Sequence, residues 1–93
     1  MQSEVNKAKS LWWKKSETNS LIKKNLPQVL TILDTVVLTL QGVDKNVKIS
    51  VISSELLKTI SILYTFDEDV PTWKKFIEID VLDGTARSVN NDI

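Results

Sequence analysis

Apolar residues recur at helical spacing in the first part of the chain. In residues 3–15 they fall at steps of three and four, the spacing of one helical face, at Val5, Ala8, Leu11 and Trp12. The polar run Ser-Glu-Thr-Asn-Ser follows at 16–20, and such side chains bond to their own backbone in turns and helix starts. The pattern predicts a first helix and then a break or kink at 16–20.

A second and more apolar segment is marked at both ends. Its leucines and valines follow helical steps, at Leu26, Leu30, Leu33, Val37 and Leu40. Asn25 is a candidate N-cap, Pro27 falls where the first turn needs no N–H, and Gly42 follows the last apolar position. Several β-branched residues favour a strand instead, but the end signals predict a helix. Its apolar residues cover more than one stripe, so we expect contacts on several sides.

Residues 47–64 carry two competing patterns. Alternation of apolar and polar residues indicates a strand over the first residues, with Val47, Ile49 and Val51 on one side. A helical spacing runs further, through Ile49, Ile52, Leu56, Ile60 and Leu63. Because the helical pattern extends to Tyr64, we expect a helix that begins at the latest near Ser53 or Ser54.

The segment after the acidic run at 67–69 is also ambiguous. Asp69 or Thr72 could cap a helix that places Trp73, Phe76 and Ile77 on one face. The alternation of Ile77, Ile79 and Val81 with Glu78 and Asp80, followed by Asp-Gly, is typical of a strand and turn. We favour the helix.

These elements predict an all-α fold, a small bundle of three or four helices in one domain spanning residues 1–93. The alternative is an α+β fold with strands near 47–52 and 76–82. The tail, residues 85–93, has little to bury, and we expect it to be frayed.

Composition excludes much of the usual catalytic chemistry. The chain has no histidine and no cysteine, so the commonest general base, the commonest metal ligand and the thiolate nucleophile are all absent. Its two glycines, Gly42 and Gly84, stand apart and form no phosphate-binding loop. The acids between Asp67 and Asp83 lack the spacing of a calcium loop. We therefore expect no enzymatic activity, no metal site, no cofactor and no small-molecule substrate.

The N-terminal residues are polar and charged, and they lack the apolar stretch of a signal peptide. Small secreted domains usually depend on disulfides, which this chain cannot form. We expect a cytoplasmic protein that neither is secreted nor spans a membrane.

Charge is distributed unevenly although the net charge is zero. Residues 1–24 hold six lysines and two glutamates, a net charge of +4, whereas residues 50–93 hold four basic and eight acidic residues, a net charge of −4. Such asymmetry is an argument about association rather than about fold.

Two adjacent tryptophans, Trp12 and Trp13, lie within the basic segment and are followed by Lys14 and Lys15. Successive residues of a helix differ by about 100° in direction, so one face cannot bury both indoles. Either Trp12 joins the core while Trp13 lies half-exposed under lysine stems, or Trp13 is an exposed anchor for a partner.

The leading hypothesis is a small, non-enzymatic, protein-binding module that acts as a regulator, adaptor, inhibitor or assembly subunit. Its partner would be another protein or a second copy of itself, and its contact residues would be Trp12, Trp13, Lys14 and Lys15. The alternative is binding of an anionic polymer or surface, a nucleic acid or an anionic membrane, through the same lysines. Zero net charge and a single arginine argue against a nucleic acid as the partner. The short apolar face of the first helix argues against a membrane role.

Overall fold

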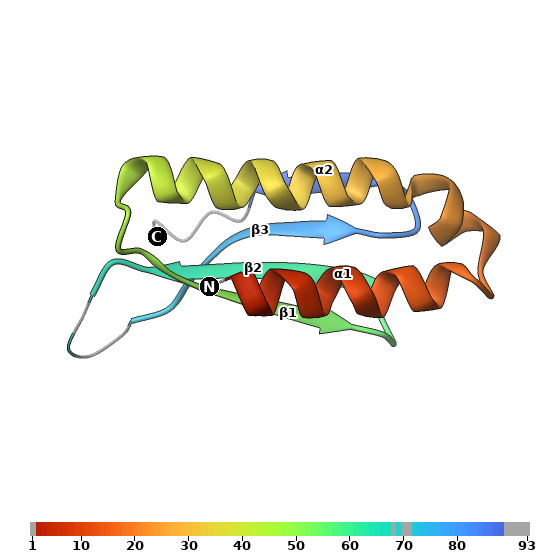
Figure 1. Ribbon diagram of the computed structural model, residues 1–93, viewed down its shortest axis with the longest axis horizontal. Helices are drawn as coiled ribbons and strands as arrows, with labels where there is room; N and C mark the ends of the chain where they lie inside the picture. The colour runs from red at the N-terminus through yellow and green to blue at the C-terminus, as the bar shows by residue number, and fades with distance from the viewer. Residues whose placement is uncertain (1, 68, 70–71, 89–93) are drawn as a thin grey trace.

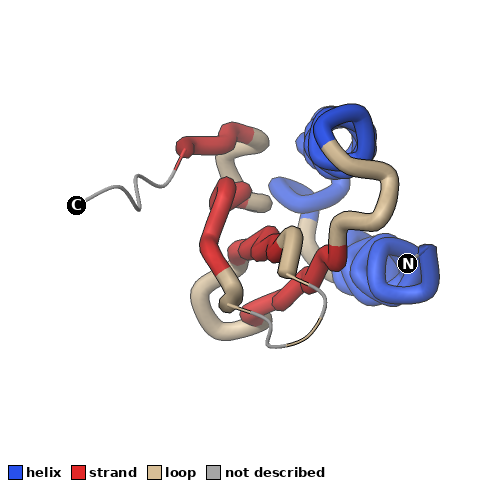
Figure 2. Tube along the Cα trace, turned by 90° about the vertical axis from the view of Figure 1, so that its left-hand side faces the viewer, coloured by secondary structure: helices blue, strands red, loops and turns tan. Residues whose placement is uncertain are grey.

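The computed structural model of the protein describes residues 2–67, 69 and 72–88. Two helices, α1 (Gln2–Ser16) and α2 (Ser20–Val43), precede four strands, β1 (Lys48–Ser54), β2 (Thr59–Thr65), β3 (Lys74–Asp80) and β4 (Thr85–Ser88). The strands form one antiparallel sheet in the order β1-β2-β3-β4. The helices lie beside one another along the sheet (Figure 1), and Figure 2 shows them on one side of the molecule with the strands on the other. The fold is therefore a two-layer α+β arrangement.

The predicted all-α bundle of three or four helices is wrong. The segments expected to form the later helices are strands: the residues between Ser53 and Tyr64 contain the end of β1, a turn and most of β2, and Trp73 to Ile77 lead into and form the first half of β3. The alternative α+β prediction placed strands near 47–52 and 76–82, which overlap β1 and β3. It did not include β2 or β4. The tail expected to fray begins with β4, and residues 89–93 lie outside the described part of the chain.

Both N-terminal helices are confirmed, and the break between them lies within 16–20 as predicted. The second helix begins earlier than its sequence signals indicated. Asn19, not Asn25, is the N-cap, because its side-chain oxygen accepts hydrogen bonds from the N–H groups of Leu21 (3.1 Å) and Ile22 (3.2 Å). Asn25 and Pro27 therefore lie inside α2.

Asn25 has a tertiary role instead of a capping one. Its side-chain amide donates to the carbonyl of Leu82 at 2.6 Å, in the turn between β3 and β4. One helical turn further on, the Gln28 amide donates to the carbonyl of Gly84. These two hydrogen bonds connect the N-terminal half of α2 to the turn between β3 and β4.

The core lies between the helices and the inward face of the sheet. Register places Val51, Ile62 and Ile77 in one row across the strands, and Ser53, Ile60 and Ile79 in the next. The α2 side chains that are buried are Ile22, Leu26, Val29, Leu33, Val36, Val37 and Leu40. By length and composition alone α2 could also cross a membrane, but in this fold the seven side chains just named are buried in the core, while Leu21, Leu38 and Val43 remain exposed.

The first edge strand, β1, is covered by α1. Glu4 of α1 accepts a hydrogen bond from the backbone N–H of Val51 at 3.3 Å. An exposed edge strand presents unpaired N–H and C=O groups that can pair with another chain. In this protein a helix lies against that edge, and one of its side chains occupies one of the backbone donors.

Gly84 is expected to be intolerant of a side chain. Its φ is +70°, a left-handed backbone conformation that costs residues with a side chain energy. An added Cβ would also lie 3.1 Å from the side chain of Asn25. We expect Gly84→Ala to lower the free energy of unfolding by about 1–3 kcal/mol, measured by urea denaturation. Gly42 is the matched control, because it lies within α2 with nothing within 4 Å of an added Cβ. Gly42→Ala should raise the free energy of unfolding by about 0.5–1 kcal/mol. A loss of stability in both variants would contradict the different surroundings of the two glycines.

Candidate functional site

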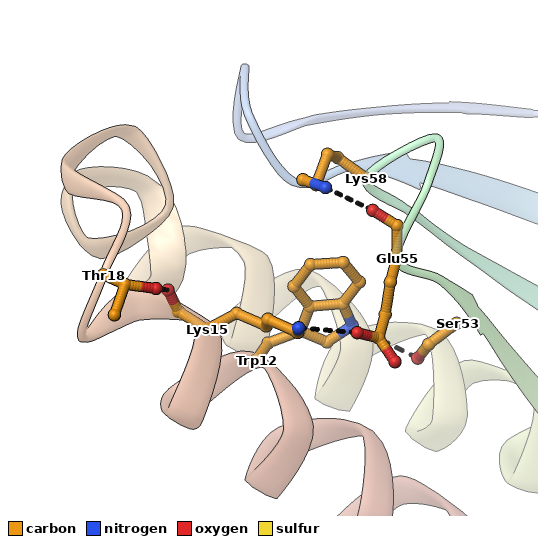
Figure 3. Close-up of polar contacts among 6 residues, drawn as sticks. All are labelled: Trp12, Lys15, Thr18, Ser53, Glu55 and Lys58. Carbon is orange, nitrogen blue, oxygen red and sulfur yellow. Dashed lines mark hydrogen bonds and ion pairs between the residues drawn. The ribbon is translucent and has the colours of Figure 1, made fainter.

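Trp12 lies in the core and holds α1 against the sheet. Its side chain is 0% exposed, and its Nε1–H donates to the Ser53 hydroxyl oxygen of β1 at 3.1 Å (Figure 3). A buried indole needs such a partner for its only polar group. Of the four predicted contact residues, Trp12 is the one whose side chain offers no surface to a partner.

Lys15 ties the end of α1 to the turn between β1 and β2. Its Nζ lies 2.6 Å from a carboxylate oxygen of Glu55, while the Lys58 ammonium donates to the carbonyl of Glu55 on the same turn (Figure 3). The hydrogen bond and the positive charge of Lys15 lower the pKa of Glu55. Both partners remain partly exposed to water, so the pair positions the turn more than it stabilises the fold.

Trp13 and Lys14 face away from the core. Trp13 is 58% exposed although it follows a completely buried residue, because one step along the helix turns its side chain by about 100°. Lys14 is exposed beside it. The structure therefore separates the predicted contact residues into two that secure α1, Trp12 and Lys15, and two on its outer surface, Trp13 and Lys14.

The outer surface of α1 contains a shallow hollow next to the indole of Trp13. The hollow has a volume of about 620 Å³ and lies between the end of α1 and the first turns of α2. Its lining residues are Ser10, Trp13, Lys14, Ser16, Glu17 and Lys23. We call it the Trp13 hollow. An apolar wall with two lysines and one glutamate suits an apolar group that carries negative charge nearby.

The N-terminal lysines do not form one uniform basic patch. Lys9 lies 2.8 Å from a carboxylate oxygen of Asp34 and joins α1 to α2, and Lys15 is paired with Glu55. The other lysines of residues 1–24 are exposed: Lys7, Lys14, Lys23 and Lys24. Two of these four line the Trp13 hollow.

The acidic residues of β3 form structural contacts. Glu78 pairs with Lys75 at 2.7 Å and with Arg87 of β4 at 3.1 Å, and the hydrogen bond from Lys75 is the largest cause that lowers the pKa of Glu78. Asp80 accepts hydrogen bonds from the backbone N–H groups of Leu82 and Asp83. Within residues 2–67, 69 and 72–88, no three acidic side chains gather in a way that could hold a metal ion.

Sequence reasoning missed two features of this end of the molecule. Lys23, assigned no contact role in the sequence analysis, lines the Trp13 hollow. Leu56 and Leu57 were expected within a helix, but they lie on the turn between β1 and β2 and are strongly exposed. The turn contains no glycine, proline or asparagine, so the usual sequence signal for it is missing.

The Trp13 hollow is thus the surface feature on which a functional argument can be built, because it combines an exposed aromatic ring with charged side chains on helical backbone. No protein-family model matches the chain, and neither a curated protein nor a solved structure does.

Proposed function

We propose that this protein is a non-enzymatic module that binds another protein through the Trp13 hollow. The partner supplies an apolar side chain that packs on the indole of Trp13, flanked by carboxylates that pair with Lys14 and Lys23. Binding occludes or tethers the partner, which is the action of a regulator, adaptor, inhibitor or assembly subunit. The observation that carries the proposal is the 58% exposure of Trp13 beside these two lysines.

The rigidity of the backbone at Trp13 supports this proposal. Trp12 is fixed in the core and bonded to Ser53, and the Ser16 hydroxyl donates to the carbonyl of Trp13 at 2.6 Å. The indole is therefore held on ordered backbone before a partner arrives, which reduces the entropy lost on binding. Tryptophan is also enriched among residues that dominate binding energy at protein interfaces.

Charge supports an acidic partner over a neutral one. The lining of the hollow has two lysines against Glu17, and Lys24 is exposed one residue after Lys23. Complementary charge mainly accelerates encounter and sets specificity. The contact should therefore weaken as salt is raised, while the apolar contact with Trp13 preserves part of the affinity.

The test compares affinity capture by the wild type with capture by the double variant Trp13→Ala, Lys14→Glu. We expect the variant to bind the captured partner about 30-fold more weakly or worse, which corresponds to a hot-spot loss of about 2 kcal/mol. The matched control is Leu38→Ala, Lys45→Glu, which removes an exposed apolar side chain and reverses an exposed lysine elsewhere. Equal weakening in both variants, or none in the first, would contradict the proposal.

Light scattering at low and high salt identifies the kind of partner. A dimer that dissociates in the Trp13→Ala, Lys14→Glu variant makes the partner a second copy of the chain. A monomer that still captures an acidic protein makes it a separate chain. A monomer that captures nothing at low salt rules out the proposed function.

A further inference from the structure

The turn between β1 and β2 presents two adjacent leucines to solvent. Leu56 is 89% exposed, the highest value among the large apolar side chains that the structure describes, and Leu57 is 70% exposed. Single exposed apolar residues are common on protein surfaces. Two neighbours at the tip of one turn form a projecting apolar point, which we call the leucine tip.

The leucine tip is held in place on three sides. Ser54 accepts a hydrogen bond from the N–H of Leu57 at 3.1 Å, and the carbonyl of Lys58 accepts one from Val81 at 3.0 Å. Glu55 is paired with Lys15 of α1. The turn is therefore fastened to α1 and to the turn between β3 and β4. Its leucines are exposed on ordered backbone and cannot be explained as part of a loose loop.

The end of the molecule that carries the leucine tip has an excess of positive charge. Figure 1 shows the end of α1, the first turn of α2 and the β1–β2 turn at the same end of the molecule. These segments, residues 14–24 and 55–58, carry five lysines and two glutamates. Exposed Leu21 in the first turn of α2 adds a further apolar side chain at this end.

The geometry points to docking of this end on an anionic lipid surface, with Leu56 and Leu57 entering the headgroup region and the lysines contacting lipid phosphates and carboxylates. A protruding pair of leucines at an end of the molecule with a net charge of +3 matches the chemistry of peripheral membrane contacts. The observations favour lipid over a protein groove for two reasons. The lysines are distributed over the end of α1, the first turn of α2 and the β1–β2 turn, which suits a broad charged surface, and leucine is under-represented among protein-interface hot spots. Lys14 and Lys23 also line the Trp13 hollow, but Leu56 and Leu57 do not, so substitution of the two leucines tests the lipid contact without altering the hollow.

The test is co-sedimentation of the full chain with lipid vesicles. The wild type should bind vesicles of phosphatidylcholine mixed with phosphatidylserine, bind pure phosphatidylcholine more weakly, and dissociate as salt rises. Leu56→Ser, Leu57→Ser should weaken binding to the anionic vesicles by about tenfold or more. Both side chains are exposed, so the thermal unfolding of this variant should be unchanged.

The matched control is Leu38→Ser, Val43→Ser, which removes two similarly exposed apolar side chains from the other end of α2. It should bind anionic vesicles like the wild type. The inference is overturned if the wild type binds no vesicles, if the tip variant binds as well as the wild type, or if both variants weaken equally. It is also overturned if the tip variant loses only self-association in light scattering, because the tip is then a protein contact. None of these outcomes bears on the Trp13 hollow, which the tip variant leaves intact.

Discussion

Replacement of Trp12 by alanine is expected to lower the free energy of unfolding by about 3–5 kcal/mol, the usual cost of truncating a buried aromatic residue. Trp12 is 0% exposed and bonded to Ser53, so the variant loses packing between α1 and the sheet and leaves a cavity behind. A domain of this size has a total stability of about 5–15 kcal/mol. The change therefore removes a large fraction of what keeps the chain folded.

The measurement is chemical denaturation followed by circular dichroism, and the adjacent residue, Trp13, provides the control. Trp13→Ala removes the same side chain from the following residue, but Trp13 is mostly exposed, so its loss should cost less than about 1 kcal/mol. Ser53→Ala separates the hydrogen bond from the packing, since it leaves the buried indole N–H without its partner at a cost of about 1–3 kcal/mol. Equal destabilisation by Trp12→Ala and Trp13→Ala would contradict the orientation of α1.

The helical half of the molecule could be predicted because its signals are local. The apolar spacing of α1 and the polar run after it are sufficient to place a helix and a break. The start of α2 was misplaced because Asn25 and Pro27 resemble a helix start, whereas the actual cap, Asn19, belongs to the polar run itself. Asn25 is used in a contact with Leu82, and no local pattern reveals a contact across such a distance in sequence.

The favoured all-α prediction was wrong about the sheet because the strands mimic a helix, and only the alternative contained strands, near 47–52 and 76–82. The apolar residues that gave the helical spacing in 47–64 do not share a face: Ile49 and Ile60 are buried, whereas Ile52 and Leu56 are exposed. The turn between β1 and β2 ends at Lys58, whose φ is +58°. That conformation is usual for glycine or asparagine, so a lysine in this place hides the turn from sequence reasoning.

The third strand shows that competing patterns need tertiary information. The alternation of Ile77 and Ile79 with Glu78 was visible in the sequence, and it is what the structure uses, since Ile79 is buried and Glu78 pairs with Arg87 on the outer face. Acids before Trp73 suggested a capped helix instead. Burial against β2 decides the outcome, because Ile60 and Ile62 need partners across the sheet, and this requirement overrides local preference.

The candidate site was predictable only as a segment. Helical geometry alone shows that Trp12 and Trp13 cannot both be buried on one face, and the structure assigns the buried position to Trp12. That Lys15 would be paired with Glu55, leaving Lys14 beside Trp13, depends on a contact between residues 40 positions apart. The contribution of Lys23 to the hollow depends on the packing of the two helices.

The second large expected effect concerns the orientation of α2. Leu33 is 0% exposed in the middle of this helix, so Leu33→Ala should lower the free energy of unfolding by about 2–5 kcal/mol. Leu38 lies on the same helix but is 69% exposed, and Leu38→Ala should change stability by less than about 0.5 kcal/mol. Urea denaturation of the two variants measures both values.

The comparison is informative because the two substitutions are chemically identical. Leucine and alanine have nearly the same preference for a helix at either position, so the difference between the variants reports only what each side chain contacts. The sequence predicted a helix contacted on several sides, whereas the structure buries the faces toward the sheet and α1 and leaves the side of Leu38 open. A comparable loss for both variants would contradict that exposure. Because nothing within the described part of the chain covers Leu38, the cover would then have to come from a second molecule, and the loss should vary with protein concentration.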